Sequence, residues 1–255
     1  MLMKSQEHTP LISLVHWFFS HKESSFFLIF IPLSFKMNNT FYNQYHMTNN
    51  KPSFHYKNLH ISLHPEVYEP AEDSFFLLDS LDVDSQHTVL EIGTGCGLIA
   101  LACAAEGASV LCTDINPYAI TLVQKNIKEN QHLLIGSVQI IQSDMFSAVK
   151  QDQRFDRIIF NPPYLPECSQ SPLPNSYWLD AATLGGKDGL TQTKRFILGL
   201  KSYLSEKGLA YTLISSFSDK KIVQKLLLET NLRYTCIKTL QLDNERLFVY
   251  QFHNK

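Results

Sequence analysis

The chain has 255 residues, of which 44% are hydrophobic, and this is enough for one domain of the larger kind with a real core. Its 22 Lys and Arg residues nearly balance 24 Asp and Glu residues, so the formal net charge is −2. This balance excludes the strongly basic composition of a chain dedicated to nucleic acid, although it does not exclude a local basic patch.

The number and spacing of the cysteines argue against two kinds of cysteine site. The count of five is odd and no CxxC pair occurs, which argues against a disulfide framework and against a zinc site. The ten histidines form no metal-binding pattern either, so no metal is predicted. The cysteines are therefore expected to be mostly small core residues in a reducing compartment, the cytoplasm: Cys96, Cys103, Cys112, Cys168 and Cys236.

The N-terminal part contains two apolar runs, Leu11–Phe19 and Phe26–Phe35, followed by a polar, Asn-rich stretch. Neither run reaches the ~20 residues of a membrane-spanning helix, and Pro32 interrupts the second. We predict a poorly ordered extension over residues 1–55 and no membrane association. A weak membrane-associating hairpin is the alternative.

From residue 56 onward, buried strand patterns alternate with amphipathic helix patterns. Pro70 and Pro117 mark helix starts, and Gly107 marks a helix end. The expected elements, in chain order, are short strands around an extended turn at 58–70, a helix at 70–81, a strand at 88–95, a helix at 98–107, a strand at 109–115, a helix at 117–130, strands at 138–144 and 155–164, a helix at 190–204, a strand at 208–215, a helix at 219–230, and strands at 233–243 and 245–253.

Such alternation predicts an α/β domain over residues 56–255 with a mostly parallel sheet covered on both faces. The last two strands are joined tightly through Asn244 and must be antiparallel, because parallel neighbours need a long crossover. The pattern therefore indicates a seven-stranded, doubly wound, Rossmann-like sheet with a reversed last strand. Residues 165–189 are expected to be irregular.

Glycines and carboxylates follow three successive strands of this sheet. The turn EIGTGCG has glycines at 93, 95 and 97, which let backbone approach a ligand closely, and its spacing differs from the G-x-G-x-x-G of dinucleotide enzymes. Asp114 ends the next strand, where a carboxylate binds the ribose hydroxyls of a nucleoside. No GK[ST] occurs, so a triphosphate loop is not expected. The predicted ligand is S-adenosylmethionine, held by Glu91, Gly93, Gly95, Asp114, Asp144 and Met145.

The motif NPPY follows the fourth strand. The residue before a proline is extended, so Asn161 continues the strand, and the two prolines make the following chain stiff. The side-chain oxygen of Asn161 and the carbonyl of Pro162 can hold a planar –NH2 group while the ring of Tyr164 covers it. Acceptors at both N–H groups favour positive charge developing on nitrogen, and alignment with a methyl sulfonium supplies ~7–11 kcal/mol. We expect methyl transfer, with Asn161, Pro162 and Tyr164 as catalytic residues.

Five motifs together resemble the HemK family of protein-glutamine N5-methyltransferases, in its archaeal and eukaryotic branch: VYEPAEDSFFLLDSL (67–81), EIGTGCG, CTDINP (112–117), FNPPY and LGGKDG (184–189). The resemblance implies a class I S-adenosylmethionine-dependent methyltransferase fold. It also implies methylation of the glutamine in the Gly-Gly-Gln motif of a class-1 translation termination factor, with help from a small zinc-binding activator subunit on an apolar flank of the sheet.

By position, the resemblance adds Ser74 and Asn161 to the cofactor residues and implies that the glutamine amide is held by Asn161, Pro162, Pro163 and Tyr164. Because NPPY also occurs in adenine-N6 DNA and RNA methyltransferases, a nucleic-acid substrate is one alternative, and a protein lysine is another. A loop over 165–189 is expected to shape the substrate entrance. Its Tyr177 and Trp178 are read as packing against their own domain rather than as a base-stacking platform, and DKKIVQK (219–225) as a solvated helix face. No stable nucleic-acid binding is expected.

Overall fold

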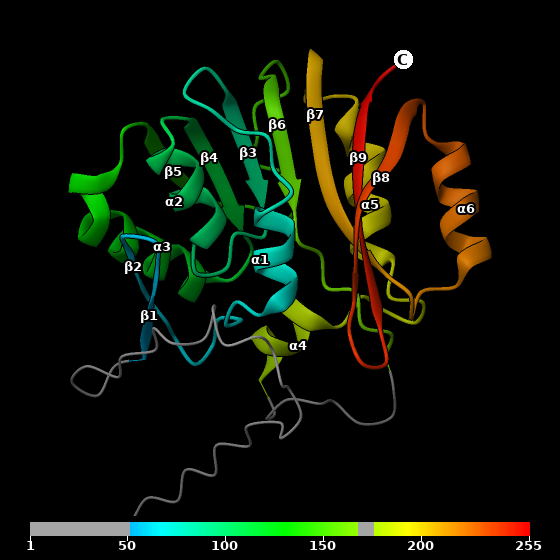
Figure 1. Ribbon diagram of the computed structural model, residues 1–255, viewed down its shortest axis with the longest axis horizontal. Helices are drawn as coiled ribbons and strands as arrows, with labels where there is room; N and C mark the ends of the chain where they lie inside the picture. The colour runs from blue at the N-terminus through cyan, green and yellow to red at the C-terminus, as the bar shows by residue number, and fades with distance from the viewer. Residues whose placement is uncertain (1–51, 168–175) are drawn as a thin grey trace, which may run out of the picture. The chain divides into compact units, whose positions relative to one another are not determined.

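Within residues 52–167 and 176–255, which the computed structural model describes, seven strands form one sheet (Figure 1). The strand order is β5-β4-β3-β6-β7-β9-β8, and β9 runs antiparallel to both of its neighbours. This confirms the predicted doubly wound sheet with a reversed last strand. The strands are β3 (Thr88–Ile92), β4 (Ser109–Asp114), β5 (Ser137–Gln142), β6 (Phe155–Phe160), β7 (Leu204–Ser215), β8 (Leu232–Gln241) and β9 (Arg246–Asn254).

The register of the parallel strands brings their carboxyl ends to one edge. Ile92 of β3 lies opposite Thr113 of β4 on one side and opposite Phe160 of β6 on the other. The residues that follow these positions therefore emerge side by side, although they are far apart in the sequence. This edge is where ligands bind in open α/β sheets.

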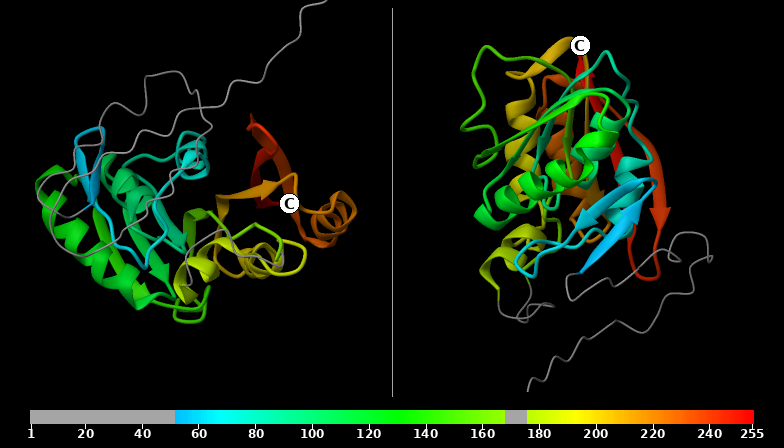
Figure 2. Two further views of the ribbon diagram at one scale, coloured as in Figure 1. Left: turned by 90° about the horizontal axis from the view of Figure 1, so that it is seen from below. Right: turned by 90° about the vertical axis from the view of Figure 1, so that its left-hand side faces the viewer.

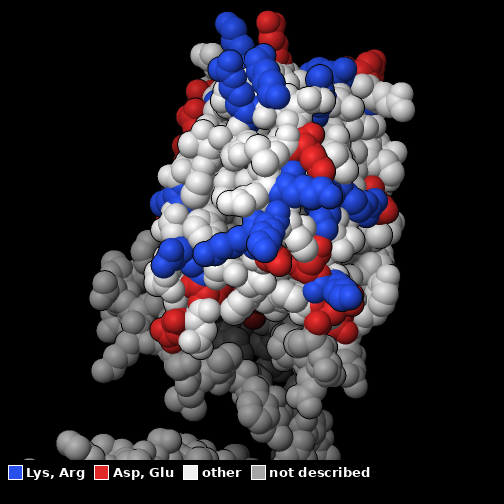
Figure 3. Space-filling view, turned by 90° about the vertical axis from the view of Figure 1, so that its right-hand side faces the viewer, with Lys and Arg blue, Asp and Glu red and all other residues white. Residues whose placement is uncertain are grey.

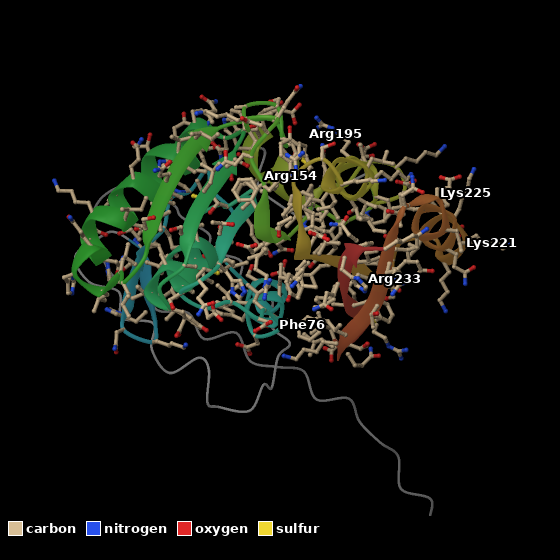
Figure 4. The ribbon with its side chains drawn as sticks, turned by 90° about the horizontal axis from the view of Figure 1, so that it is seen from above. Phe76, Arg154, Arg195, Lys221, Lys225 and Arg233 are labelled. Carbon is tan, nitrogen blue, oxygen red and sulfur yellow. The ribbon has the colours of Figure 1, made fainter. Side chains whose placement is uncertain are left out.

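One face of the sheet is covered by α5 (Thr191–Leu200) and α6 (Lys220–Glu229). Strand residues alternate between the two faces, so Ile158 packs into this core while its neighbour Ile159 packs into the core on the opposite face. Phe196 of α5 is fully buried, which contributes about 1.5–3 kcal/mol. Viewed along the strands, Arg195 of α5 and Phe76 lie on opposite sides of the sheet (Figure 4).

The opposite face is covered by α1 (Glu72–Leu78), α2 (Leu98–Ala105) and α3 (Pro117–Asn130), with the short 3-10 helix η1 (Gln131–Leu133) after α3. The bounds of α3 match the prediction, because Pro117 and the Asn116 cap fix its start. Figure 2 shows α1 and α5 on the two sides of the sheet.

An antiparallel hairpin of β1 (Ser53–Tyr56) and β2 (Leu59–Ser62) packs against α3. Two buried asparagines of α3 bond its backbone: Asn126 accepts from the Ser62 N–H at 3.0 Å, and Asn130 accepts from the His60 N–H at 2.8 Å. The described fold therefore begins a few residues before the expected boundary at 56. The extension predicted over residues 1–55 otherwise lies outside the described residues, as do both apolar runs.

Two expectations about the second half were wrong. The stretch 165–189 is not irregular throughout, because it contains α4 (Tyr177–Thr183), whose start is capped by Ser176. The helix predicted over 190–204 ends at Leu200, and Leu204 instead begins β7, where it is buried opposite Phe155. Seven residues are too few for periodicity to separate a short helix from a loop.

Most of the described cysteines are buried. Of the described cysteines, Cys96, Cys103 and Cys112 are buried as expected, whereas Cys236 is exposed on β8, and Cys168 lies outside the described residues. Among the helices of residues 52–167 and 176–255, none has the length and apolar character needed to cross a bilayer.

Candidate active site

The glycine turn after β3 lies against the end of β6. Gly93 and Gly95 both have positive φ values, 64° and 57°, which favour glycine. A Cβ on Gly93 would stand 3.2 Å from the ring of Phe160, so the turn packs directly on the strand that leads to NPPY. Gly97 then opens α2 with φ 85°. The turn thus presents backbone, rather than side chains, at the carboxyl edge.

Glu91 lies beneath this turn and is almost fully buried. Its Oε2 accepts a hydrogen bond of 2.7 Å from the hydroxyl of Thr94 in the turn. Burial raises the pKa of the Glu91 carboxyl to about 8, although the Thr94 hydrogen bond works in the opposite direction. The side chain therefore both supports the turn and lines the adjoining cavity.

Asp114, at the end of β4, is held in place by backbone donors. Its two carboxylate oxygens accept from the N–H groups of Gly95 and Asn116, each at 2.9 Å. Burial raises the pKa of the Asp114 carboxyl, while these hydrogen bonds oppose the shift. A carboxylate offers about four acceptor directions, so these backbone donors leave acceptor capacity for a ligand hydroxyl.

The loop after β5 carries a strained residue and an ion pair. Met145 has φ 52°, an unusual value for a residue with a side chain, and it is buried. Asp144 receives two hydrogen bonds from the Arg195 guanidinium, at 2.8 and 2.9 Å. The pair is half exposed, so it contributes little stability, but it fixes the direction of the carboxylate.

The NPPY segment runs past the first turn of α1. Asn161 Nδ2 donates to Asp73 Oδ2 at 3.0 Å and to the Ser74 hydroxyl at 3.3 Å, and the hydroxyl of Tyr164 donates to Asp73 at 3.4 Å. Asn161 Oδ1 is buried and has no hydrogen-bond partner among the described residues. An unpaired buried acceptor costs about 1–3 kcal/mol, which makes it a candidate contact for a ligand N–H group.

One cavity of about 430 Å³ connects these parts at the carboxyl edge, where α1 and α4 lie (Figure 1). Residues that the sequence did not assign also line it, among them Asp73 of α1 and, from α4, Tyr177 and Trp178. Asp73 belongs to the motif VYEPAEDS. An acidic residue in the first turn of a helix, within a motif of the family, was the sequence signal that could have assigned it to the site. Every predicted site residue lines this cavity: Ser74, Glu91, Gly93, Gly95, Asp114, Asp144, Met145, Asn161, Pro162, Pro163 and Tyr164.

Three segments next to the glycine turn are tied together by hydrogen bonds. Asn116 donates to the backbone oxygen of Glu66 at 2.7 Å, and the Ser176 hydroxyl at the start of α4 donates to the Glu66 carboxylate at 2.6 Å. Tyr177 and Trp178 form an edge-to-face pair with ring centroids 4.9 Å apart. Because both line the cavity, their predicted role as ordinary packing residues is incomplete.

The residues present fit S-adenosylmethionine. The Asp114 carboxylate keeps acceptor capacity for ribose hydroxyls, a Cβ on Gly95 would occupy open space beside the turn, and Asn161, which lines the same cavity, has an unpaired Oδ1. In contrast, the described residues contain no group of three or more His, Cys, Asp or Glu side chains arranged to hold a metal ion.

Comparisons with known proteins agree with this geometry. The Methyltransferase small domain family matches residues 65–172. A protein of Methanocaldococcus jannaschii, provisionally named protein N5-glutamine methyltransferase, is 45% identical over 168 residues, which are 65% of this chain and 81% of that protein. Human Methyltransferase HEMK2 is 29% identical over 197 residues, covering 73% of this chain and 89% of the human protein.

A solved structure has the same fold. A chain of the E. cuniculi Mtq2–Trm112 complex superposes with a TM-score of 0.55 at 22% identity, and the match covers 74% of this chain and 99% of that one.

Proposed function

This chain belongs to the HemK family of protein-glutamine N5-methyltransferases, and we propose that it methylates the glutamine of the Gly-Gly-Gln motif in a class-1 translation termination factor. The single observation that carries the substrate chemistry is the buried, unpartnered Oδ1 of Asn161, a residue that lines the cavity together with Pro162. Among relatives, the Mtq2–Trm112 complex is described as responsible for methylating the eRF1 termination factor.

The cofactor is S-adenosylmethionine, which supplies a methyl group activated by its sulfonium charge. We assign its ribose to Asp114, its contact with backbone to Gly93 and Gly95, and its remaining contacts to Ser74, Glu91, Asp144 and Met145, all of which line the cavity. We assign Asn161 to both the cofactor and the substrate amide.

The chain's own contribution to the reaction is orientation and charge stabilisation. A carboxamide nitrogen is a weak nucleophile because its lone pair is delocalised. Asn161 Oδ1 and the Pro162 carbonyl would each accept one N–H of the substrate amide, which favours the positive charge that develops on nitrogen. In the transfer, the nitrogen would form its bond to the methyl group as the S–CH3 bond breaks, and S-adenosylhomocysteine would leave. The proton lost from the nitrogen would pass to solvent, because the two amide oxygens hold the N–H groups but are too weakly basic to keep a proton. Tyr164 and Pro163 keep the amide in plane.

Two finer assignments accompany this proposal. A small partner subunit of the Trm112 kind would cover an apolar flank of the sheet, and Ile135, 80% exposed beside the edge strand β5, marks one such flank. A cytoplasmic location is proposed because the described cysteines are free thiols, which persist in reducing compartments.

Transfer of radiolabelled methyl to the organism's own termination factor tests the proposal. The purified chain, with and without a Trm112-type subunit, should label the Gly-Gly-Gln protein but neither a Gly-Gly-Ala version nor an oligonucleotide. Labelling of the oligonucleotide would favour an adenine-N6 methyltransferase, and equal labelling of the Gly-Gly-Ala protein would favour another side chain such as lysine. Either result would overturn the proposed substrate.

A further inference from the structure

The two ends of the Asn161 amide have nearly the same shape, so its hydrogen-bond partners decide which end faces the cavity. On the protein side, Nδ2 donates to Asp73 at 3.0 Å and to the Ser74 hydroxyl at 3.3 Å. On the other side, Oδ1 is buried without a partner among the described residues. The acceptor required by a substrate –NH2 group is therefore available only in this one orientation.

Asp73 is the acceptor in each of its side-chain hydrogen bonds that the structure shows. Its Oδ1 accepts from the N–H of Ser74 at 2.7 Å, from the Ser74 hydroxyl at 3.1 Å and from the Tyr68 hydroxyl at 3.4 Å. Its Oδ2 accepts from Asn161 Nδ2 and from the hydroxyl of Tyr164. An ionised carboxylate can only accept, so it requires the nitrogen end of the Asn161 amide.

We propose that Asp73 is a positioning residue that fixes the orientation of the Asn161 amide, so that Oδ1 faces the substrate. This inference rests on the proposed amide substrate and extends it to a residue that the sequence did not assign. Asp73 is 5% exposed, and we assign its effect to its hydrogen bond with Asn161 rather than to a contact of its own with the substrate. Its role should therefore appear in the turnover rate of bound substrate.

The substitution Asp73→Asn gives a directional test. The backbone N–H of Ser74 cannot move, so the new amide must keep its oxygen there and direct its nitrogen toward Asn161. Two –NH2 groups would then face each other, and the Asn161 amide would have to rotate and present Nδ2 to the substrate. Loss of a positioned group of this kind lowers kcat by about 100-fold.

A reciprocal exchange provides a rescue that a merely structural role of Asp73 would not give. In Asp73→Asn combined with Asn161→Asp, the amide at 73 donates to one oxygen of the carboxylate at 161, and the other oxygen faces the substrate as an acceptor. At saturating cofactor, kcat of the exchange variant should exceed that of Asp73→Asn by at least about tenfold. Asp79→Asn, the same substitution at an exposed site just after α1, is the matched control and should retain wild-type kcat.

Calorimetry of cofactor binding and thermal melting test whether misfolding, rather than a rotated Asn161 amide, causes the loss of turnover in Asp73→Asn. Both should stay close to wild type in Asp73→Asn, because the Ser74 and Tyr68 donors keep an oxygen acceptor. The proposal is overturned if Asp73→Asn turns over within about threefold of wild type, or if the exchange variant is no faster than Asp73→Asn, since either result contradicts the loss expected from a misoriented acceptor.

A measurement without substrate separates this proposal from the proposed function. In the nitrogen-15 spectrum of the wild-type chain, one Asn161 Nδ2 proton should be shifted downfield by its bond to a carboxylate, and Asn161→Ala assigns the signal. Asp73→Asn should remove the shift. The proposed function fails if the wild-type chain does not methylate the Gly-Gly-Gln protein. The positioning role of Asp73 is overturned, independently, if the downfield shift of the Asn161 proton is absent in the wild type or unchanged in Asp73→Asn.

Discussion

At the scale of single residues, the proposal gives Asn161 two separable tasks, which are contact with the cofactor and acceptance of a hydrogen bond from the substrate amide. We expect Asn161→Ala to leave S-adenosylmethionine affinity within about tenfold of wild type, because the ribose and backbone contacts assigned to Asp114 and the glycine turn remain. Methyl transfer should fall by a factor of about 100–1,000, since the acceptor for the amide is lost. Calorimetry measures the affinity for S-adenosylmethionine, and single-turnover kinetics measure the rate of methyl transfer. A variant that no longer binds cofactor would contradict this division of roles.

Glu91 makes stability depend on pH. Its carboxyl has a pKa of about 8 in the folded protein, raised by burial from an ordinary value of 4.5. The unfolded chain therefore releases this proton near pH 4.5 whereas the folded protein retains it, so the free energy of unfolding falls as the pH rises from 4.5 to about 8.

The variant Glu91→Gln stays neutral and should lack this loss. Its melting temperature should match or fall slightly below wild type near about pH 5 and exceed it by about 10 °C or more near pH 8–9, because the pKa shift from 4.5 to about 8 corresponds to about 5 kcal/mol. Thermal melts of both proteins across this range, without cofactor, measure the difference. A difference that does not change with pH would mean that Glu91 is ionised in the folded protein throughout.

At the scale of elements, the segment LGGKDG holds the NPPY segment by direct backbone contact. The N–H of Gly185 donates to the Leu165 oxygen at 2.8 Å, and a Cβ on Gly185 would lie 2.4 Å from the Pro163 oxygen. A Cβ on Gly189 would lie 2.3 Å from the Tyr164 oxygen. Glycine is required here because two backbones touch, which explains why these residues accompany NPPY in the sequence.

We expect Gly185→Ala to destabilise the protein by about 1–3 kcal/mol and to lower kcat more than cofactor affinity, because the new methyl group pushes the segment at Pro163 out of place. Lys187→Ala in the same loop is the control, since Lys187 is exposed and should tolerate the change. Thermal melting measures the loss of stability, and steady-state kinetics measure kcat and the apparent affinity for the cofactor. Wild-type turnover in Gly185→Ala would show that the contact does not position the substrate site.

At the scale of the whole molecule, basic side chains gather on the face that includes α6, with acidic ones among them (Figure 3). Lys221 and Lys225 point outward from this helix (Figure 4), and Lys225 lies 3.8 Å from Glu229. None of the described residues that line the cavity belongs to α6. The charges there are consistent with a solvated helix face, as the sequence predicts.

Charge reversal tests this interpretation. Lys221→Glu combined with Lys225→Glu should leave kcat/KM for the termination factor within about twofold of wild type, because exposed charges contribute little. A nucleic-acid substrate that used this face would instead lose affinity and show a weaker dependence on salt. Methylation assays at two salt concentrations distinguish these outcomes, and a large loss with the protein substrate would place α6 in substrate binding.

Truncation tests the domain boundary. The first described element, β1, begins at Ser53, so a chain lacking residues 1–50 keeps all of the described helices and strands. We expect this chain to be soluble, to melt within about 2 °C of the full chain and to have equal specific activity. Loss of folding on truncation would contradict the predicted extension.

Apart from α4, the sequence determined the order of helices and strands, because hydrophobic period and capping residues act over a few neighbouring positions. The pattern over 117–130 gave α3 its bounds, and the tight connection at Asn244 required the reversed last strand. The same local logic located the glycine turn, Asp114 and NPPY at strand ends, and parallel strands bring such ends to one edge.

Only the tertiary structure decided which distant side chains meet. Asp73 and Asn161 are 88 positions apart, and their hydrogen bond depends on how α1 packs beside the end of β6. The helix α4 is anchored by a bond between Ser176 and Glu66, 110 positions apart, and the buried Asn126 bonds the hairpin 64 positions away. Periodicity specifies the backbone along each segment, whereas the choice of these partners depends on the packing of all segments together, so it cannot be read from any one of them.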